Sequence, residues 1–199
     1  MNEIAGIVLA AGRSARMAPR NKLLEPVGGE PMIRRVAANV LSSGIQPVVV
    51  VTGYEAGRVA EALRGLDVRV VTNPAYADGL STSLRVGLTA LPPGIDGALI
   101  FLGDMPEVEI PVIHALLAAF TGPDAICAPV HRGQRGNPVL WGSSYFAEMM
   151  SLIGDVGAKP LMARHANHLI EVEVATDSIF EDIDSPADLA RLNQSGTNR

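Results

Sequence analysis

The sequence contains a single cysteine, Cys127, in 199 residues. One cysteine excludes an internal disulfide and a metal site built from cysteines. Cys127 stands in the apolar run of residues 125–128, where a free cysteine is most often a plain core residue. The four histidines show no spacing typical of metal ligands. We therefore expect no site built from cysteine and histidine.

The sequence also lacks a long apolar segment. No run approaches the roughly 20 apolar residues that a membrane helix needs. The apolar run nearest the N-terminus, residues 4–11, is one strand long, and the residues before it lack the positive charge of a signal peptide. These features predict a soluble cytoplasmic protein that binds no membrane.

An excess of basic residues is missing as well. There are 16 Lys and Arg against 21 Asp and Glu, which gives a net charge of −5 without any Lys/Arg run. Nucleic-acid surfaces concentrate positive charge, so we expect no nucleic-acid partner. A local basic cluster can still bind a small anion in an acidic protein.

The length and the composition favour one packed domain. Hydrophobic residues make up 48% and charged residues 19% of the chain, so the apolar surface suffices to offset the entropy of ordering. No repeat, low-complexity segment or linker divides the chain. We assign residues 1–193 to a single domain and expect residues 194–199 to form a frayed tail.

What the chain does contain is an alternation of apolar runs and helical patterns. Apolar runs typical of strands buried on both faces of a parallel sheet lie at 4–10, 47–52, 67–72, 98–102 and 125–130. Helical patterns lie at 33–41, 56–63, 83–91, 110–120 and 144–152, and strand-like segments follow at 139–141 and 168–174. Repeated β–α units predict an α/β fold, namely a Rossmann-like three-layer α/β/α sandwich with a mostly parallel sheet.

Two basic residues follow the first predicted strand in a loop of small residues. Residues 9–17 read Leu-Ala-Ala-Gly-Arg-Ser-Ala-Arg-Met, and Lys22 comes shortly after. Ligands of open α/β sheets bind beyond the carboxyl ends of strands, where backbone N–H groups, Arg16 and Lys22 can bind a triphosphate. The segment is neither a Walker loop nor a Gly-x-Gly-x-x-Gly loop. An ordinary solvated turn remains the alternative.

Aspartates follow two extended segments. Asp104 ends the predicted strand at 98–102, where a carboxylate can bind Mg²⁺ together with phosphate oxygens and water. It can equally cap a turn before the proline that follows. Asp182 and Asp184 lie two residues apart in a stretch expected to be extended, and one of them can reach the metal. The Ser-Pro pair after them also fits a simple helix start.

A hydroxyl-rich helix start follows Asn73. The segment from Gly79 to Ser83 carries several hydroxyl groups, and a helix N-terminus presents free N–H groups. Such groups can hydrogen-bond a nucleobase or a phosphate. Simple capping by Ser81 or Thr82 is the alternative.

Taken together, these segments resemble the MobA-like NTP transferases, relatives of the sugar-nucleotide pyrophosphorylases. The resemblance extends in order over nearly the whole chain and implies a fold of the nucleotide-diphospho-sugar transferase type. It is strongest to molybdenum cofactor cytidylyltransferases, and Ala10-Ala11 looks like the CTP-using branch. The matching segments are Leu9 to Met17 with Asn21 to Leu24, then Gly-Asp-Met-Pro at 103–106, Gly-Asn-Pro-Val-Leu at 136–140, Gly-Asp-Val-Gly-Ala at 154–158 and Asp-Ile-Asp-Ser-Pro at 182–186.

The resemblance implies a Mg²⁺-dependent nucleotidyltransferase that moves CMP from CTP to the terminal phosphate of a molybdopterin-type cofactor and releases pyrophosphate. It implies Arg16, Lys22 and Asp104 as catalytic residues, with Asp104 and Asp184 as metal ligands. The implied nucleotide contacts are Leu9, Ala10, Ala11, Gly12, Arg13, Ser14, Arg16, Lys22, Asn73, Gly79, Ser81, Ser83 and Asp104. The implied contacts of the pterin acceptor are Arg135, Asn137, Pro138 and Asp155.

Several alternatives stay open. GTP or another NTP can replace CTP, and a sugar or alditol phosphate can replace the pterin. A chaperone that binds a molybdenum cofactor and delivers it to a client molybdoenzyme without turnover is a further possibility, although simple binding does not need two carboxylates beside a triphosphate. A purely structural domain leaves Arg16, Lys22 and Asp104 unexplained.

Overall fold

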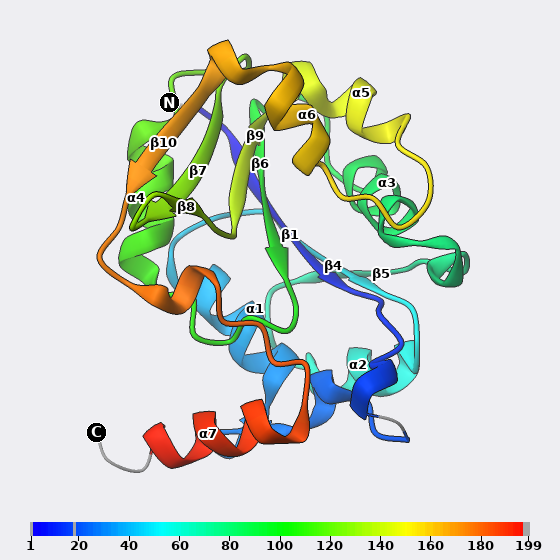
Figure 1. Cartoon of the computed structure of the whole chain (residues 1–199). Coiled ribbons are helices and arrows are strands. Elements are labelled where there is room, and N and C mark those ends of the chain that lie inside the picture. Colours follow the sequence, from blue (N-terminus) through cyan, green and yellow to red (C-terminus); the bar gives the residue numbers. More distant parts are fainter. Residues whose placement is uncertain (1, 18, 197–199) are drawn as a thin grey trace.

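The fold is built around one twisted, mostly parallel sheet. The computed structural model describes residues 2–17 and 19–196. Its main sheet has the strand order β10-β7-β9-β6-β1-β4-β5, with β8 paired to β7, and β2 and β3 form a separate hairpin (Figure 1). The strands are β1 (Ile4–Ala10), β2 (Pro26–Val27), β3 (Glu30–Pro31), β4 (Val48–Thr52), β5 (Arg69–Thr72), β6 (Gly97–Leu102), β7 (Ile126–His131), β8 (Gln134–Arg135), β9 (Val139–Gly142) and β10 (Leu169–Glu173).

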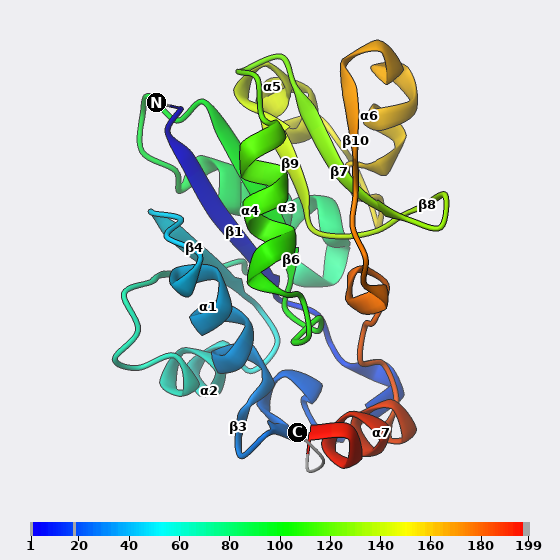
Figure 2. The ribbon, with the colours of Figure 1, turned by 90° about the vertical axis from the view of Figure 1, so that its left-hand side faces the viewer.

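Helices cover both faces of this sheet, so the predicted three-layer α/β/α sandwich is confirmed. One core contains side chains of α1, α2 and α4, and the other contains side chains of α3, α5 and α6. Figure 2 shows α1 and α4 on one side of the strands and α3 behind them. The helices are α1 (Met32–Ser42), α2 (Ala56–Ala62), α3 (Leu80–Thr89), α4 (Ile110–Ala119), α5 (Phe146–Met150), α6 (Lys159–Arg164) and α7 (Pro186–Gly196).

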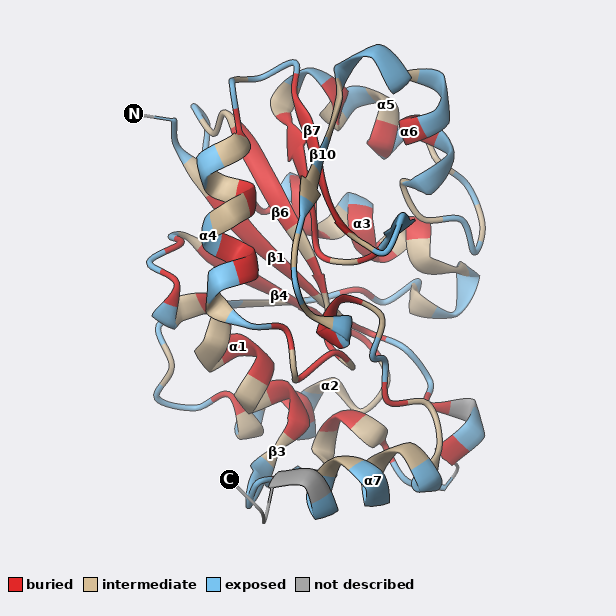
Figure 3. Cartoon of the chain, turned by 60° about the vertical axis from the view of Figure 1, so that its left-hand side comes forward, coloured by how far each residue is buried: buried red, intermediate tan, exposed pale blue. Residues whose placement is uncertain are grey.

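The continuous apolar runs form strands because both faces of the sheet are covered. In β1, Ile7 packs into the core of α3 while Val8 packs into the core of α1. Every residue of β4 is buried. Successive side chains of a strand point to opposite faces, so a strand between two helix layers needs apolar residues throughout. Burial is concentrated along these strands and the inner sides of the helices (Figure 3).

The strand at 139–141 enters the sheet in the reverse direction. β9 lies between β6 and β7 and pairs antiparallel with both. The pairs β1–β4, β1–β6, β4–β5 and β7–β10 are parallel. The sheet is therefore mostly parallel, as predicted, and its reversed strands are β9 and the short β8, which pairs antiparallel with β7.

Several element boundaries differ from the predictions. β5 is partly exposed because it ends the sheet, whereas two-sided burial was expected. α3 begins at Leu80, three residues before the predicted helix, and most of the segment 144–152 forms a 3₁₀ turn followed by the short α5. α7 continues to Gly196, beyond residue 193, and residues 197–199 lie outside the described part. Within the described part, no helix has the length and apolarity needed to cross a bilayer.

The parallel strands bring two chemically important loops together. Leu9 pairs with Leu102 across β1 and β6, so the loops that follow these strands leave the same edge of the sheet. Gly103 donates a backbone hydrogen bond of 2.9 Å to the Leu9 carbonyl beyond the last strand pair. A side chain at position 103 would meet this carbonyl at 3.0 Å. A glycine here lets the two loops approach closely.

Candidate active site

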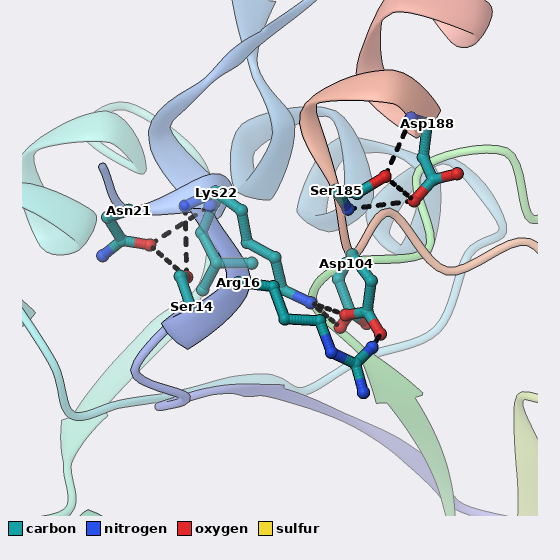
Figure 4. A network of polar contacts seen from close by, with 9 residues as sticks. Ser14, Arg16, Asn21, Lys22, Asp104, Ser185 and Asp188 are labelled. Atoms are coloured by element: carbon teal, nitrogen blue, oxygen red, sulfur yellow. Dashed lines mark hydrogen bonds and ion pairs between the residues drawn. The ribbon is translucent and has the colours of Figure 1, made fainter. Parts of the chain in front are cut away.

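The loop after β1 is held in shape by two buried polar side chains. The Ser14 hydroxyl accepts a hydrogen bond of 3.1 Å from the backbone N–H of Lys22, and it lies 3.4 Å from the Asn21 amide oxygen (Figure 4). The same Asn21 oxygen accepts a hydrogen bond of 3.1 Å from the Leu23 N–H, which caps a 3₁₀ turn over Lys22–Leu24. These bonds fix the backbone of Lys22 against the loop. Asn21 was not singled out as a site residue, although it belongs to a matching segment.

Two basic and two acidic side chains meet below this loop. The Lys22 ammonium lies 2.7 Å from Oδ2 of Asp104 and 2.6 Å from Oδ1 of Asp184 (Figure 4). The Arg16 guanidinium pairs with the other oxygen of Asp184. The structure thus brings together all the residues predicted as catalytic or metal-binding.

The carboxylates keep Lys22 charged. Burial lowers the pKa of Lys22, but the charges and hydrogen bonds of Asp104 and Asp184 outweigh it, so the pKa lies above its ordinary value of 10.5. The Lys22 side chain is only 13% exposed. It is therefore a partly buried ammonium at neutral pH, suited to binding phosphate oxygens.

Asp184 reaches the site because the segment before α7 is anchored to Asp104. The Ile183 N–H donates a hydrogen bond of 2.9 Å to the backbone carbonyl of Asp104. Two residues earlier, Asp182 is exposed and is not among the residues that line the cleft around Lys22, so Asp184 is the carboxylate of this segment that reaches the site. Ser185 caps α7, since its hydroxyl accepts from the Asp188 N–H while the Asp188 carboxylate accepts from the Ser185 N–H. The segment before α7 therefore has both predicted roles: Ser185 caps the helix, and the preceding Asp184 reaches the site.

The donor set fits a hard divalent cation. Oδ1 of Asp104 is buried and has no hydrogen-bond partner among the described residues. Across residues 2–17 and 19–196, no group of three or more His, Cys, Asp or Glu side chains is arranged to hold a metal. Magnesium typically takes one or two carboxylates and completes its shell with phosphate oxygens and water. Asp104 and Asp184 supply two carboxylates beside a triphosphate-sized space.

A cleft of about 620 Å³ opens above these four side chains. Most of the predicted nucleotide contacts line it: Leu9, Ala11, Gly12, Arg13, Ser14, Arg16, Lys22, Gly79, Ser83 and Asp104. Three do not, because Ala10, Asn73 and Ser81 are each about 1% exposed and face the interior. The Asn73 amide nitrogen donates to the hydroxyls of Thr82 and Ser83, at 2.8 and 2.9 Å. Asn73 thus supports the start of α3 behind the cleft wall.

Tyr76 is a part of the cleft that sequence reasoning missed. Its ring lines the cleft, and the Arg13 guanidinium lies 5.6 Å from the ring centroid. A cation over an aromatic face is attracted by the ring's electron density. The only sequence signal was an aromatic residue between Asn73 and Gly79, and nothing local showed that Arg13 reaches it.

A second cavity, of about 450 Å³, adjoins the cleft and has mainly apolar walls. The two spaces share Leu9, Leu80, Leu102 and Asp155, while Leu84, Ile100, Val139, Trp141 and Met162 line only the second. Asn137 and Asp155 of the predicted acceptor contacts line this cavity.

The other two predicted acceptor contacts do not line either cavity. Arg135 lies in β8, where its guanidinium binds the Glu171 carboxylate of β10 at 2.5 Å. Pro138 is buried. The β7–β8 hairpin turns Arg135 toward the sheet edge, which the polar loop sequence did not reveal.

The chain is similar to known nucleotidyltransferases in sequence. A family model described as the MobA-like NTP transferase domain matches residues 6–169. The chain is 34% identical over 143 residues to the bifunctional protein GlmU of Sphingopyxis alaskensis, covering 71% of this chain but 31% of that protein. It therefore spans about a third of that relative's length. It is 25% identical over 189 residues to the molybdenum cofactor cytidylyltransferase of Escherichia coli, covering 94% of each.

Solved structures show the same likeness over the whole chain. A nucleotidyl transferase from Methanothermobacter thermautotroptrophicus superposes with a TM-score of 0.87 at 30% identity, covering 100% of this chain and 99% of that one. The Rv0371c protein of Mycobacterium tuberculosis, in complex with manganese, superposes with a TM-score of 0.76 at 27% identity, covering 98% and 100%. The likeness extends over nearly the full length of both chains in each comparison.

Proposed function

Because the chain belongs to the MobA-like NTP transferase family, we propose that it is a Mg²⁺-dependent nucleotidyltransferase that moves CMP from CTP to the terminal phosphate of a molybdopterin-type cofactor. The observation that carries this proposal is the meeting of Arg16, Lys22, Asp104 and Asp184 at the base of one cleft. Two cations and two carboxylates beyond the carboxyl ends of the parallel strands suit a metal-bound triphosphate.

The chain's own residues bind and orient the phosphates. Small residues of the loop after β1 let its backbone approach the triphosphate, while Lys22 and Arg16 neutralise the charge that builds on it. A terminal phosphate oxygen of the acceptor attacks the α-phosphorus in line and forms a new P–O bond. The bond from the α-phosphorus to the bridging oxygen breaks, and its electron pair leaves with pyrophosphate. A phosphate is already an anionic nucleophile, so positioning and electrostatics suffice.

Two carboxylates would hold the metal. Asp104 and Asp184 would provide the ligands, and Oδ1 of Asp104, which is buried and has no hydrogen-bond partner among residues 2–17 and 19–196, marks a position that a cation would satisfy. Magnesium bound there would neutralise phosphate charge and polarise the α-phosphoryl group. The manganese complex of a structural relative supports a divalent metal in this fold.

The second cavity suits a flat acceptor. Its walls are largely apolar and include Trp141, and Asn137 and Asp155 add hydrogen-bonding groups beside the shared border with the cleft. A heterocycle in this cavity would place an attached phosphate toward the cleft. The name of the E. coli relative, a molybdenum cofactor cytidylyltransferase, supports a molybdenum cofactor as acceptor, and Ala10-Ala11 supports CTP as donor.

Pyrophosphate release tests this function. The purified protein is incubated with Mg²⁺ and molybdenum cofactor, and release is measured with CTP, GTP, ATP and UTP in turn. Reactions without cofactor serve as controls. Release with CTP alone is expected. Release with GTP would assign the protein to the GTP-using relatives. Release only when a sugar or alditol phosphate is present would show that such a phosphate, not the pterin cofactor, is the acceptor. If no nucleotide gives pyrophosphate release in a sample that binds the cofactor, the result would favour a chaperone that delivers the cofactor to a client enzyme.

A further inference from the structure

The two acidic residues of the site are already paired with cations from the chain itself. Lys22 binds one oxygen of Asp104 and one of Asp184, and Arg16 binds the second oxygen of Asp184. Three of the four carboxylate oxygens are therefore occupied. The fourth, Oδ1 of Asp104, is buried without a partner among the described residues. The two positive and two negative charges cancel.

This pairing opposes binding of a metal ion on its own. A divalent cation that approaches Asp104 and Asp184 meets a cluster that is already neutral, and it also meets the nearby charges of Lys22 and Arg16. Like charges a few Å apart repel strongly where water is partly excluded. One free carboxylate oxygen is too little to replace the shell that Mg²⁺ prefers.

A bound triphosphate makes metal binding favourable. Its oxygens compete for Lys22 and Arg16, which line the same cleft, and it brings ligands for the metal. The Arg16 side chain is 74% exposed, so little packing opposes its turning from Asp184 to a phosphate. The backbone of Lys22 is fixed through Ser14, but its four-carbon stem lets the ammonium swing.

We infer, on the basis of the proposed function, that Lys22 and Arg16 close the metal site in the free protein and that the nucleotide triphosphate opens it. The metal and the nucleotide then bind as one unit, with Lys22 and Arg16 exchanging carboxylate partners for phosphate partners. By thermodynamic linkage, each ligand raises the affinity for the other by the same factor.

Removal of the Lys22 charge is expected to raise the affinity of the free protein for a divalent cation. If Lys22 only supported the metal ligands, its removal would weaken metal binding. If it competes with the metal, the Lys22→Met variant binds a divalent cation more tightly than the wild type when no nucleotide is present. We expect a gain of about tenfold or more, because a neighbouring positive charge is removed from a partly buried site. Lys22→Arg keeps the charge and is expected to bind weakly, like the wild type.

The experiment measures binding of Mn²⁺ to the intact protein by the electron paramagnetic resonance signal of the free ion, so it needs no turnover. Wild type, Lys22→Met, Lys22→Arg and Arg16→Gln are titrated without nucleotide. Arg20→Gln is the matched control, because it removes one charge from the same segment while the Arg20 guanidinium faces Glu25 at 3.6 Å. Circular dichroism and thermal melting establish that each variant is folded.

A second titration adds a CTP analogue with a non-hydrolysable α–β bridge, corrected for Mn²⁺ bound by the analogue alone. Tighter Mn²⁺ binding by Lys22→Met without nucleotide, and tight binding by the wild type only with the analogue, support the inference. Equal or weaker Mn²⁺ binding by Lys22→Met would overturn it. Tight wild-type binding without nucleotide would also overturn it, yet leave the proposed function standing. No binding by any variant even with the analogue would reject both the inference and a metal-dependent transferase.

Discussion

The Asp155 carboxylate accepts a hydrogen bond of 3.2 Å from the backbone N–H of Leu80, the first residue of α3. The neighbouring Ser81 N–H donates at 3.2 Å to the Gly154 carbonyl. Asp155 and Leu80 both border the cleft and the second cavity. This pair therefore fastens the loop of the second cavity to the wall of the nucleotide cleft.

Replacing Asp155 with alanine is expected to disturb the acceptor more than the nucleotide. The Leu80 N–H would lose its carboxylate partner, much as a helix loses a cap, at a stability cost of about 1 kcal/mol. The loop would then move, so we expect a several-fold higher KM for the acceptor. Urea unfolding and steady-state kinetics measure both effects. Asp155→Asn keeps an accepting oxygen and should remain close to wild type; unchanged values for the alanine variant would contradict the role of this contact.

Asp104→Asn should remove most turnover without unfolding the protein. The change keeps the shape of the side chain but removes the charge that balances Lys22 and holds the proposed metal. The loss of one electrostatic element of this kind lowers kcat on the order of 10²-fold or more. Pyrophosphate release measures it. Asp182→Asn is the control, since its side chain is exposed and it is not among the residues that line the cleft. Near-wild-type turnover in the Asp104 variant would reject its assignment.

Trp141 should report binding of the acceptor. It is the only tryptophan in the chain, and it lines the second cavity. A pterin bound there would quench the tryptophan emission, whereas CTP alone would leave it nearly unchanged. Fluorescence titration with molybdopterin and separately with CTP distinguishes the two spaces. Quenching by CTP but not by molybdopterin would place the acceptor elsewhere.

Cys127 should be inert in the folded protein. Burial in β7 raises the pKa of its thiol to about 11, so at pH 8 roughly one part in a thousand is the reactive thiolate. A thiol reagent such as 5,5′-dithiobis(2-nitrobenzoate) should react slowly with native protein and rapidly after denaturation with guanidinium chloride. Rapid labelling of the native chain would show that this strand opens.

The start of α7 should make stability depend on pH. Hydrogen bonding from Ser185, partly opposed by desolvation, lowers the pKa of Asp188 below its ordinary value of 3.8. A lowered pKa adds stability above the unfolded value, and this stability is lost as the pH falls through the folded one. Asp188→Ala should therefore reduce the free energy of unfolding more at pH 7 than at pH 2. Denaturant unfolding at both pH values tests this. A difference that does not vary with pH would contradict it.

The sequence by itself determined the layers and the position of the main site. Continuous apolar runs such as β4 indicate strands covered on both faces, and the stripe through Ile33 and Val40 indicates a helix with one buried side. Side-chain direction repeats every two residues in a strand and about every 3.6 in a helix, so these elements are visible locally. Because parallel strands end at one sheet edge, the loop at 9–17 and Asp104 could be placed together without a structure.

Only the tertiary structure decided how side chains from distant segments face one another. Lys22 reaches carboxylates 82 and 162 residues away, Asn73 turns inward to the hydroxyls of α3, and Arg135 turns toward Glu171 and away from the cavities. The reversed direction of β9 likewise depends on its two neighbours. Such arrangements depend on packing and on long-range hydrogen bonds, which local periodicity does not encode.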